Sequence, residues 1–290
     1  MTIAACYVSS EGVVFGADST ASYSGPNSMR HYNHAQKLFE IGEMGSTLGL
    51  VTWGRGGFPA VSYRQLVAEL SEDLIAKEPL TVEEACKRWI QLFWKHYEQS
   101  FAADLAACQA LAVKSPRTVA EDKALESYIR AMTVGFCIGG RVRKDRNPMA
   151  YQIVFDPSKP GPPIPVPINR FQPIFWGVPN MMERLLYGVD GTICQGILAS
   201  GHWTGKPADL NKIIAQSVLS PNAELPLRDA IDWIFSSIFV TIKALKFSST
   251  PPFCGGPIEV AVVTADRPFR WVRHKGLDQA LSDHATRGKF

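Results

Sequence analysis

Three side chains in the first forty residues could together catalyse acyl transfer: Thr2, Asp18 and Lys37. A threonine hydroxyl is a poor nucleophile at neutral pH and needs a neighbouring base to take its proton. A free α-amine can serve as that base, because its pKa lies at about 7.7–8.0. Thr2 gains such an amine once Met1 is removed, and a residue this small normally permits that removal. The sequence therefore predicts an N-terminal threonine nucleophile.

Lys37 and Asp18 have complementary parts in this chemistry. Lys37 shares a predicted strand face with the apolar Phe39 and Ile41, so its ammonium is directed toward an apolar side. A positive charge there would depress the pKa values of the Thr2 amine and hydroxyl. Asp18 would hold the lysine in place and balance its charge.

A predicted hairpin brings the start of the chain to Asp18. With a two-residue loop at Ser10-Glu11, the numbers of facing residues sum to about 21. Thr2 then lies opposite Asp18 or Ser19. Further along, Gly54 ends a strand before a helix, where an exposed backbone N–H could stabilise a tetrahedral oxyanion.

The elements that position these residues occur in blocks. Strands are predicted at 2–8, 13–18, 36–41, 48–53, 131–142, 149–155, 171–176, 257–264 and 269–272. Helices are predicted at 58–77, from a capping box at Thr81 and Glu84 onward, and at 180–188, 207–219 and 227–247. This order suits an α+β domain in which helix layers flank a strand sandwich.

We therefore predict a single domain of residues 1–290. The stretch 97–130 stays helical but is broken at Ser115-Pro116, which makes it an elaboration on the core. Six prolines between Pro157 and Pro167 predict an extended connector.

Composition argues against several classes of function. The net charge is +3 and 20% of the residues are charged, which gives no reason to expect nucleic-acid binding. The basic run is predicted to be a solvated hairpin loop; it comprises Arg141, Arg143, Lys144 and Arg146. Six scattered cysteines lack any Cys-x-x-Cys pair, and His31 and His34 lack further ligands, so we expect no metal and no cofactor. With no signal peptide and no long apolar stretch, we expect a cytoplasmic protein without membrane association.

Four segments resemble proteasome β-subunits in order and spacing. They are Thr2-Ile3, the run VVFGADS at 13–19, KLFEI at 37–41 and LVTWG at 50–54. Within that family the chain is most similar to the bacterial proteasome homologues, with Anbu and the HslV peptidase as more distant relatives. The resemblance implies a four-layer αββα sandwich of the N-terminal nucleophile (Ntn) hydrolase type over nearly the whole chain.

Carried over residue by residue, the resemblance implies a complete set of catalytic roles. Thr2 would be nucleophile and base, Asp18 and Lys37 its activating pair, and Gly54 the oxyanion donor. Ser22 would hydrogen-bond the backbone of an extended substrate. The implied specificity pocket is small and mostly uncharged and favours an apolar side chain; it comprises Ala21, Ala35, Phe39, Thr52 and Gly56.

The second half of the chain departs from the family pattern. Gly177-Val178-Pro179-Asn180 stands where the family has a serine in a Gly-Ser-Gly turn, although Tyr187-Gly188-Val189-Asp190 resumes the likeness. Pro251 and Cys254 replace an aspartate and a serine that orient the threonine amine and relay protons. The loss of such support implies weak or narrow catalysis.

The resemblance implies a threonine-type peptidase that cleaves peptides or polypeptides. Its subunits would form two stacked rings of six or seven copies, fed by an unidentified unfoldase or cap. Two alternatives stay open: a ring-forming structural or binding shell, and an amidase for a small molecule or an isopeptide.

Overall fold

The computed structural model describes residues 2–24, 29–42, 45–219, 224–249 and 254–275. In this part of the chain, seven α-helices accompany three antiparallel sheets, so the α+β class is confirmed. Met1, Pro251 and the polar tail from 276 lie outside the described residues.

The first large sheet has the strand order β10-β1-β2-β11-β12 and draws on both ends of the chain. Its strands are β1 (Ile3–Val8), β2 (Gly12–Ala17), β10 (Ile174–Gly177), β11 (Glu259–Thr264) and β12 (Arg270–Arg273). The second large sheet has the order β5-β6-β7-β8-β9. It consists of β5 (Leu38–Ile41), β6 (Leu48–Gly54), β7 (Val134–Gly140), β8 (Met149–Phe155) and β9 (Val166–Pro167). The short strands β3 (Ala21–Ser24) and β4 (Met29–Tyr32) form a separate hairpin.

The β1–β2 hairpin has the predicted register. Ala4 pairs with Ala17 and Val8 with Val13, so the two numbers of each pair sum to 4 + 17 = 21. Ser9 N–H donates to Gly12 O (2.9 Å) and closes the two-residue loop. The hairpin alone therefore brings the beginning of β1 to the residue that follows β2.

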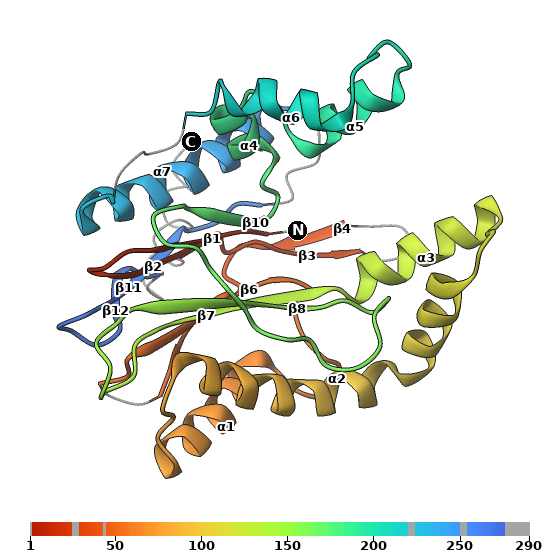
Figure 1. The fold of residues 1–290 in the computed structure, drawn as a ribbon. Helices are drawn as coiled ribbons and strands as arrows, with labels where there is room; N and C mark the ends of the chain where they lie inside the picture. Colours follow the sequence, from red (N-terminus) through yellow and green to blue (C-terminus); the bar gives the residue numbers. More distant parts are fainter. Residues whose placement is uncertain (1, 25–28, 43–44, 220–223, 250–253, 276–290) are drawn as a thin grey trace, which may run out of the picture.

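The two large sheets pack face to face, with helices on their outer faces (Figure 1). Between the sheets, Trp53 of β6 stacks on Trp176 of β10, with ring centroids 4.3 Å apart and planes 5° from parallel. On one outer side α7 (Leu227–Lys246) buries Ile234 and Ile238 against β1 and β2. Gly16 of β2 leaves room for this helix, because a Cβ there would lie 2.5 Å from the Ile234 side chain.

The other outer face is covered by α1 (Tyr63–Ala76) and α2 (Val82–Val113). Trp89 and Phe93 of α2 are fully buried over β7 and β8, where they contact Phe136 and Phe155. Large aromatic side chains of this kind contribute most of the apolar area that a core removes from water.

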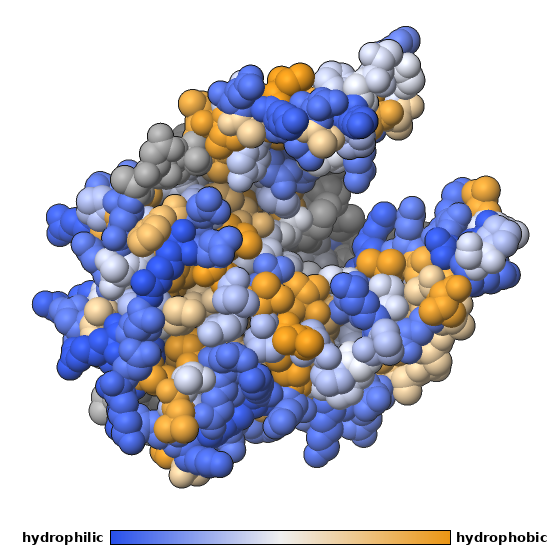
Figure 2. Space-filling model, in the orientation of Figure 1, coloured by the Kyte–Doolittle hydropathy of each residue, from blue (hydrophilic) through white to orange (hydrophobic). Residues whose placement is uncertain are grey.

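The helical elaboration extends beyond this core. Helix α2 is kinked at Phe101 and continues to Val113, and α3 (Val119–Met132) folds back on it after the predicted break at Ser115-Pro116. Thr118 and Glu121 form a reciprocal capping box that starts α3. Figure 2 shows this arm on one side of a hollow, with the region of α5 on the other.

Helix α5 (Gly191–Ala199) and the β3–β4 hairpin were not predicted. Two glycines lower the helix propensity of α5, and a buried cap starts it instead: the Asp190 carboxylate accepts the Ile193 N–H at 2.8 Å. The remaining helices, α4 (Asn180–Tyr187) and α6 (Pro207–Ala215), lie within their predicted ranges.

The prediction for the basic run was partly wrong. Arg143, Lys144 and Arg146 are exposed in the β7–β8 loop, but Arg141 is only 8% exposed. Its Nε donates to Thr264 O (2.9 Å) at the end of β11, and burial lowers the pKa of its guanidinium. Sequence spacing could not show that this loop folds against a strand 123 residues further along.

Candidate active site

Thr2 lies immediately before β1 and is 5% exposed. Strand β10 runs beside it, with Gly177 paired to Ile3. Gly177 has a φ of +86°, and a Cβ at this position would lie 1.8 Å from the Thr2 carbonyl oxygen. Only glycine permits this close approach. Because β1 pairs with β10 on one side and with β2 on the other, the backbone next to Thr2 is held from both sides.

Asp18 follows β2 and is fully buried, with four donors on its two carboxylate oxygens. Oδ1 accepts the Ile3 N–H (3.1 Å) and the Lys37 ammonium (2.6 Å). Oδ2 accepts the N–H groups of Gly255 (2.9 Å) and Thr20 (3.2 Å). Such a set of donors suits an ionised carboxylate, which can only accept hydrogen bonds. The Ile3 nitrogen belongs to the Thr2–Ile3 peptide bond, so the carboxylate touches the beginning of the chain directly.

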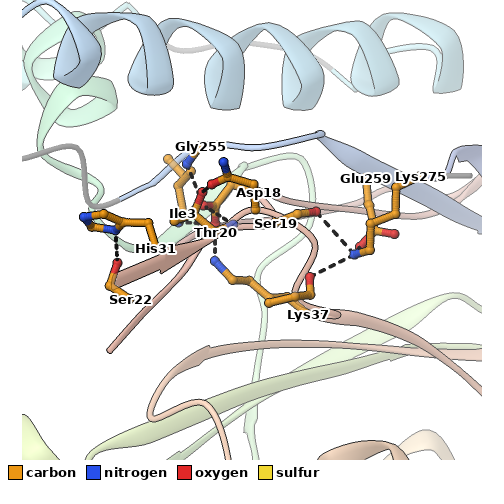
Figure 3. A network of polar contacts seen from close by, with 12 residues as sticks. Ile3, Asp18, Ser19, Thr20, Ser22, His31, Lys37, Gly255, Glu259 and Lys275 are labelled. Carbon is orange, nitrogen blue, oxygen red and sulfur yellow. Dashed lines mark hydrogen bonds and ion pairs between the residues drawn. The ribbon is translucent and has the colours of Figure 1, made fainter. Parts of the chain in front are cut away.

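Lys37 points at this carboxylate from the second sheet, and its side chain is 8% exposed (Figure 3). Thr52 N–H donates to Lys37 O (2.9 Å), which places the lysine beside the end of β6. Burial lowers the pKa of Lys37, and the Asp18 charge and hydrogen bond act in the opposite direction. The structure thus brings together the predicted ion pair and the residue adjoining Thr2.

Gly54 is the last residue of β6 and is exposed. It pairs with Val134 and has a φ of +83°, a conformation that side-chain-bearing residues rarely adopt. A Cβ on Gly54 would lie 2.5 Å from Thr133 O. The position therefore requires glycine for both backbone conformation and space.

Gly54→Ala is expected to lower the free energy of unfolding by about 1–3 kcal/mol, because a non-glycine residue at positive φ is strained and the Thr133 backbone must move. Chemical denaturation in urea measures this change. Gly56→Ala is the matched control, since Gly56 lies in the following loop with no atom within 4 Å of an added Cβ. Equal unfolding midpoints for the two variants would contradict the strain at Gly54.

The predicted substrate-binding residues fall into separate places. Ala21 and Ala35 line one pocket, together with Arg30 and His34. Ser22 Oγ lies 2.9 Å from His31 Nδ1 across the β3–β4 hairpin.

The other predicted pocket residues do not share that cavity. Phe39 packs in the core between β5 and α1, and the Thr52 hydroxyl donates to Gly135 O (3.1 Å). Gly56 is exposed in the loop after β6. The pocket beside Ala21 and Ala35 thus carries basic groups that the strand pattern did not indicate.

Cys254 lies beside the ion pair and is 3% exposed. Burial raises the pKa of its thiol to about 12; the Asp18 charge adds to this effect and Lys37 opposes it. The thiol is therefore protonated at neutral pH and is not a nucleophile there.

A second buried polar group adjoins the site and was missed from the sequence. Glu259 begins β11 and is fully buried, and Lys275 follows β12 with its ammonium 2.8 Å from Glu259 Oε2. Figure 3 shows both residues beside Lys37 and Ser19. A glutamate inside the apolar run PIEVAVVT was an available signal, whereas nothing in the polar sequence around Lys275 marked that residue.

Among the described residues, no three His, Cys, Asp or Glu side chains are grouped as metal ligands. In the same part of the chain, no helix combines the length and the apolar character needed to cross a bilayer.

The chain matches no protein-family model and no curated protein sequence. Solved structures similar to it include two Anbu proteins. Anbu (ancestral beta-subunit) from Yersinia bercovieri has a TM-score of 0.50 and 12% identity, over 100% of this chain and 98% of that chain. The Anbu (Gly-1) mutant from Hyphomicrobium sp. strain MC1 has a TM-score of 0.47 and 14% identity, over 99% of this chain and 96% of that chain.

The fold is therefore similar to that of the Yersinia bercovieri Anbu protein, which the sequence resemblance indicated as a more distant relative. The likeness is one of fold, because 12% identity carries no information on activity.

Proposed function

We propose that this chain is an N-terminal threonine hydrolase, with Thr2 as nucleophile after removal of Met1. The observation that carries the proposal is the sharing of one carboxylate oxygen: Asp18 Oδ1 accepts both the Thr2–Ile3 peptide N–H and the Lys37 ammonium. Burying a lysine ammonium away from water costs free energy even when the charge is paired, which favours a functional role for a lysine kept in such a place. Here the lysine and its partner lie at the peptide bond that follows Thr2.

In the proposed reaction, Thr2 Oγ attacks the carbonyl carbon of an amide and its proton passes to the free α-amine. The tetrahedral intermediate collapses to an ester as the C–N bond breaks, and the departing amine takes that proton. Water then hydrolyses the ester and returns Thr2 to its original state. The Lys37 charge lowers the pKa values of the amine and hydroxyl, Asp18 orients Lys37, and the Gly54 N–H stabilises the oxyanion.

The substrate class that we propose is a peptide or polypeptide, which makes the chain a threonine-type peptidase. The pocket that contains Ala21 and Ala35 would receive one substrate side chain, and Ser22 would bind the substrate backbone. Cys254, in place of a serine beside the ion pair, supports slow or narrow catalysis, because a protonated thiol is a weak hydrogen-bond donor.

We further propose a single domain of residues 1–290 built as a four-layer αββα sandwich, with the arm of α2 and α3 added to it. By likeness of fold to an ancestral β-subunit, copies of the chain would stack as two rings of six or seven subunits in the cytoplasm. The rings would enclose the sites, so that only unfolded chains enter, with an unfoldase or cap as the feeding partner.

Intact-protein mass spectrometry with and without a peptide epoxyketone tests the proposal. The expected result is a protein lacking Met1 that gains the mass of one inhibitor, because epoxyketones add to the hydroxyl and amine of an N-terminal threonine together. Loss of Met1 without any adduct contradicts catalysis and favours the structural shell. Adduct formation without hydrolysis of extended peptides, but with hydrolysis of compact amides, favours the small-molecule amidase.

A further inference from the structure

Lys275 makes three polar contacts beside the proposed site. Its ammonium lies 2.8 Å from Ala35 O, 3.3 Å from Ser19 Oγ and 2.8 Å from Glu259 Oε2. The side chain is 10% exposed, so these partners replace nearly all of the water around the charge. A buried ammonium has three N–H donors, and the three contacts use all of them.

Two of these contacts join the segments that bear the ion pair. Ser19 is the neighbour of Asp18, and Ala35 lies two residues before Lys37. Ala35 N–H donates to Ser19 O (2.9 Å), which already links the two segments through the backbone. Lys275 adds a second link by binding the Ser19 side chain and the Ala35 carbonyl at once.

Glu259 supplies the compensating charge. Its carboxylate is fully buried, with Lys275 on Oε2 and His274 Nδ1 2.7 Å from Oε1. The contact with His274 is an ion pair only when the imidazole is protonated. Strand β11 fixes Glu259 opposite Ala17, directly before Asp18.

We propose that Lys275 is a positioning residue of the active site, whose buried ammonium holds the two backbone segments bearing Asp18 and Lys37 together. The inference rests on the proposed hydrolase function and extends it to a residue 238 positions from Lys37, since 275 − 37 = 238. Lys275 acts through Ser19 and Ala35 and does not contact Asp18 or the Thr2–Ile3 peptide.

The charge of Lys275 also acts on the site. It lowers the pKa of Lys37, although burial of Lys37 is the larger cause. The groups that face Lys37 are Asp18 from β2, Cys254 before β11, and Lys275 after β12, with Glu259 and His274 behind Lys275. Removing the Lys275 charge while Glu259 stays ionised makes the site more negative. The pKa of the Thr2 amine should then rise, because a more negative site favours the protonated amine.

The rate of epoxyketone adduct formation as a function of pH tests this role. For Lys275→Met, the maximal rate of adduct formation is expected to fall about 10- to 100-fold, the usual loss for a supporting residue, while the inhibitor concentration at half-maximal rate changes less than about 2-fold. The acid limb of the pH profile should move to higher pH by about one unit. Lys275→Arg keeps the charge and should retain a rate within about 5-fold of wild type. Lys144→Met, in the exposed β7–β8 loop, is the matched control and should match wild type.

Two further variants separate charge from position. Glu259→Gln leaves the Lys275 bonds to Ser19 and Ala35 in place, so it should move the acid limb to lower pH with a small change in maximal rate. The double variant Glu259→Gln/Lys275→Met should restore the wild-type acid limb but not the maximal rate. A wild-type rate and acid limb for Lys275→Met, or a change confined to inhibitor affinity, would overturn the positioning role. If Lys275→Met does not fold, the opposite pH shift of Glu259→Gln decides the question.

Failure of the hydrolase proposal gives a different result. Wild-type protein would then form no adduct, whereas ¹³C NMR of lysine Cε would still report Lys37, assigned by its absence in Lys37→Arg. Since the Lys275 charge lowers the pKa of Lys37, Lys37 should titrate at higher pH in Lys275→Met. An unchanged Lys37 titration would reject the inference even if the enzyme is active.

Discussion

Thr2→Ala is expected to reduce peptide-amide hydrolysis by at least about 10³-fold and to abolish the epoxyketone adduct, because it deletes the proposed nucleophile while keeping the free α-amine. Alanine, like threonine, has a side chain small enough to permit removal of Met1, so processing should be unchanged. Thr2→Ser keeps both hydroxyl and amine and should retain measurable hydrolysis. Initial rates with a fluorogenic peptide and intact mass measure the two effects.

The unfolding midpoint of Thr2→Ala is the control for this experiment, because it shows whether the variant is folded. Thr2 is buried, but its side chain takes no part in the hydrogen bonds that Asp18 accepts from Ile3 and Lys37. Thr2→Ala should therefore shift the unfolding midpoint only slightly. Hydrolysis by Thr2→Ala at the wild-type rate would place the nucleophile elsewhere. Ser22, whose half-buried hydroxyl lies 2.9 Å from His31 Nδ1, would then be the next residue to replace.

Asp18→Asn is expected to cost about 3–5 kcal/mol of unfolding free energy and nearly all activity. The replacement leaves the Lys37 charge buried without its carboxylate, which is the costly way to break a buried ion pair. In the wild type, Ile3 N–H donates to one carboxylate oxygen, and the N–H groups of Gly255 and Thr20 donate to the other. In either orientation of the asparagine amide, its NH₂ group faces backbone N–H donors. Urea denaturation measures the loss of stability.

A second variant separates the unpaired charge from the lost hydrogen bonds. Asp18→Asn/Lys37→Met removes both charges and should unfold at higher urea than Asp18→Asn alone, while remaining inactive. Lys87→Met, which breaks the exposed pair with Glu83, is the control and should change stability by less than about 1 kcal/mol. Equal midpoints for Asp18→Asn and the double variant would mean that the buried charge is not what destabilises the protein.

The parts of the site that lie close in sequence were predictable, because local rules determine them. A two-residue turn fixed the β1–β2 register and hence the position of Asp18 beside Ile3. The alternation along β5 did not give the direction of Lys37. Phe39 and Ile41, with which it was predicted to share a face, pack in the core that includes α1, whereas Lys37 precedes β5 and its ammonium reaches Asp18.

The remaining contacts depend on strand order, which no local pattern determines. Gly255, Glu259 and Lys275 reach the site because β11 pairs with β2 and β12 with β11. The same limit explains Arg141, whose burial depends on the end of β11. Helix α5 was missed for a different reason, since an aspartate cap offsets a weak, glycine-containing sequence.

The pairing of β2 with β11 has a consequence for biosynthesis. A nascent polypeptide that has left the ribosome only through α7 already contains Thr2, Asp18 and Lys37, yet it lacks the Gly255 amide and the Lys275 ammonium. One of the two N–H donors to Asp18 Oδ2, that of Gly255, and the second link between Ser19 and Ala35, through Lys275, form only after α7 has been made. The proposed nucleophile would thus stay poorly organised until the segment that follows α7 has been synthesised and has folded onto β2.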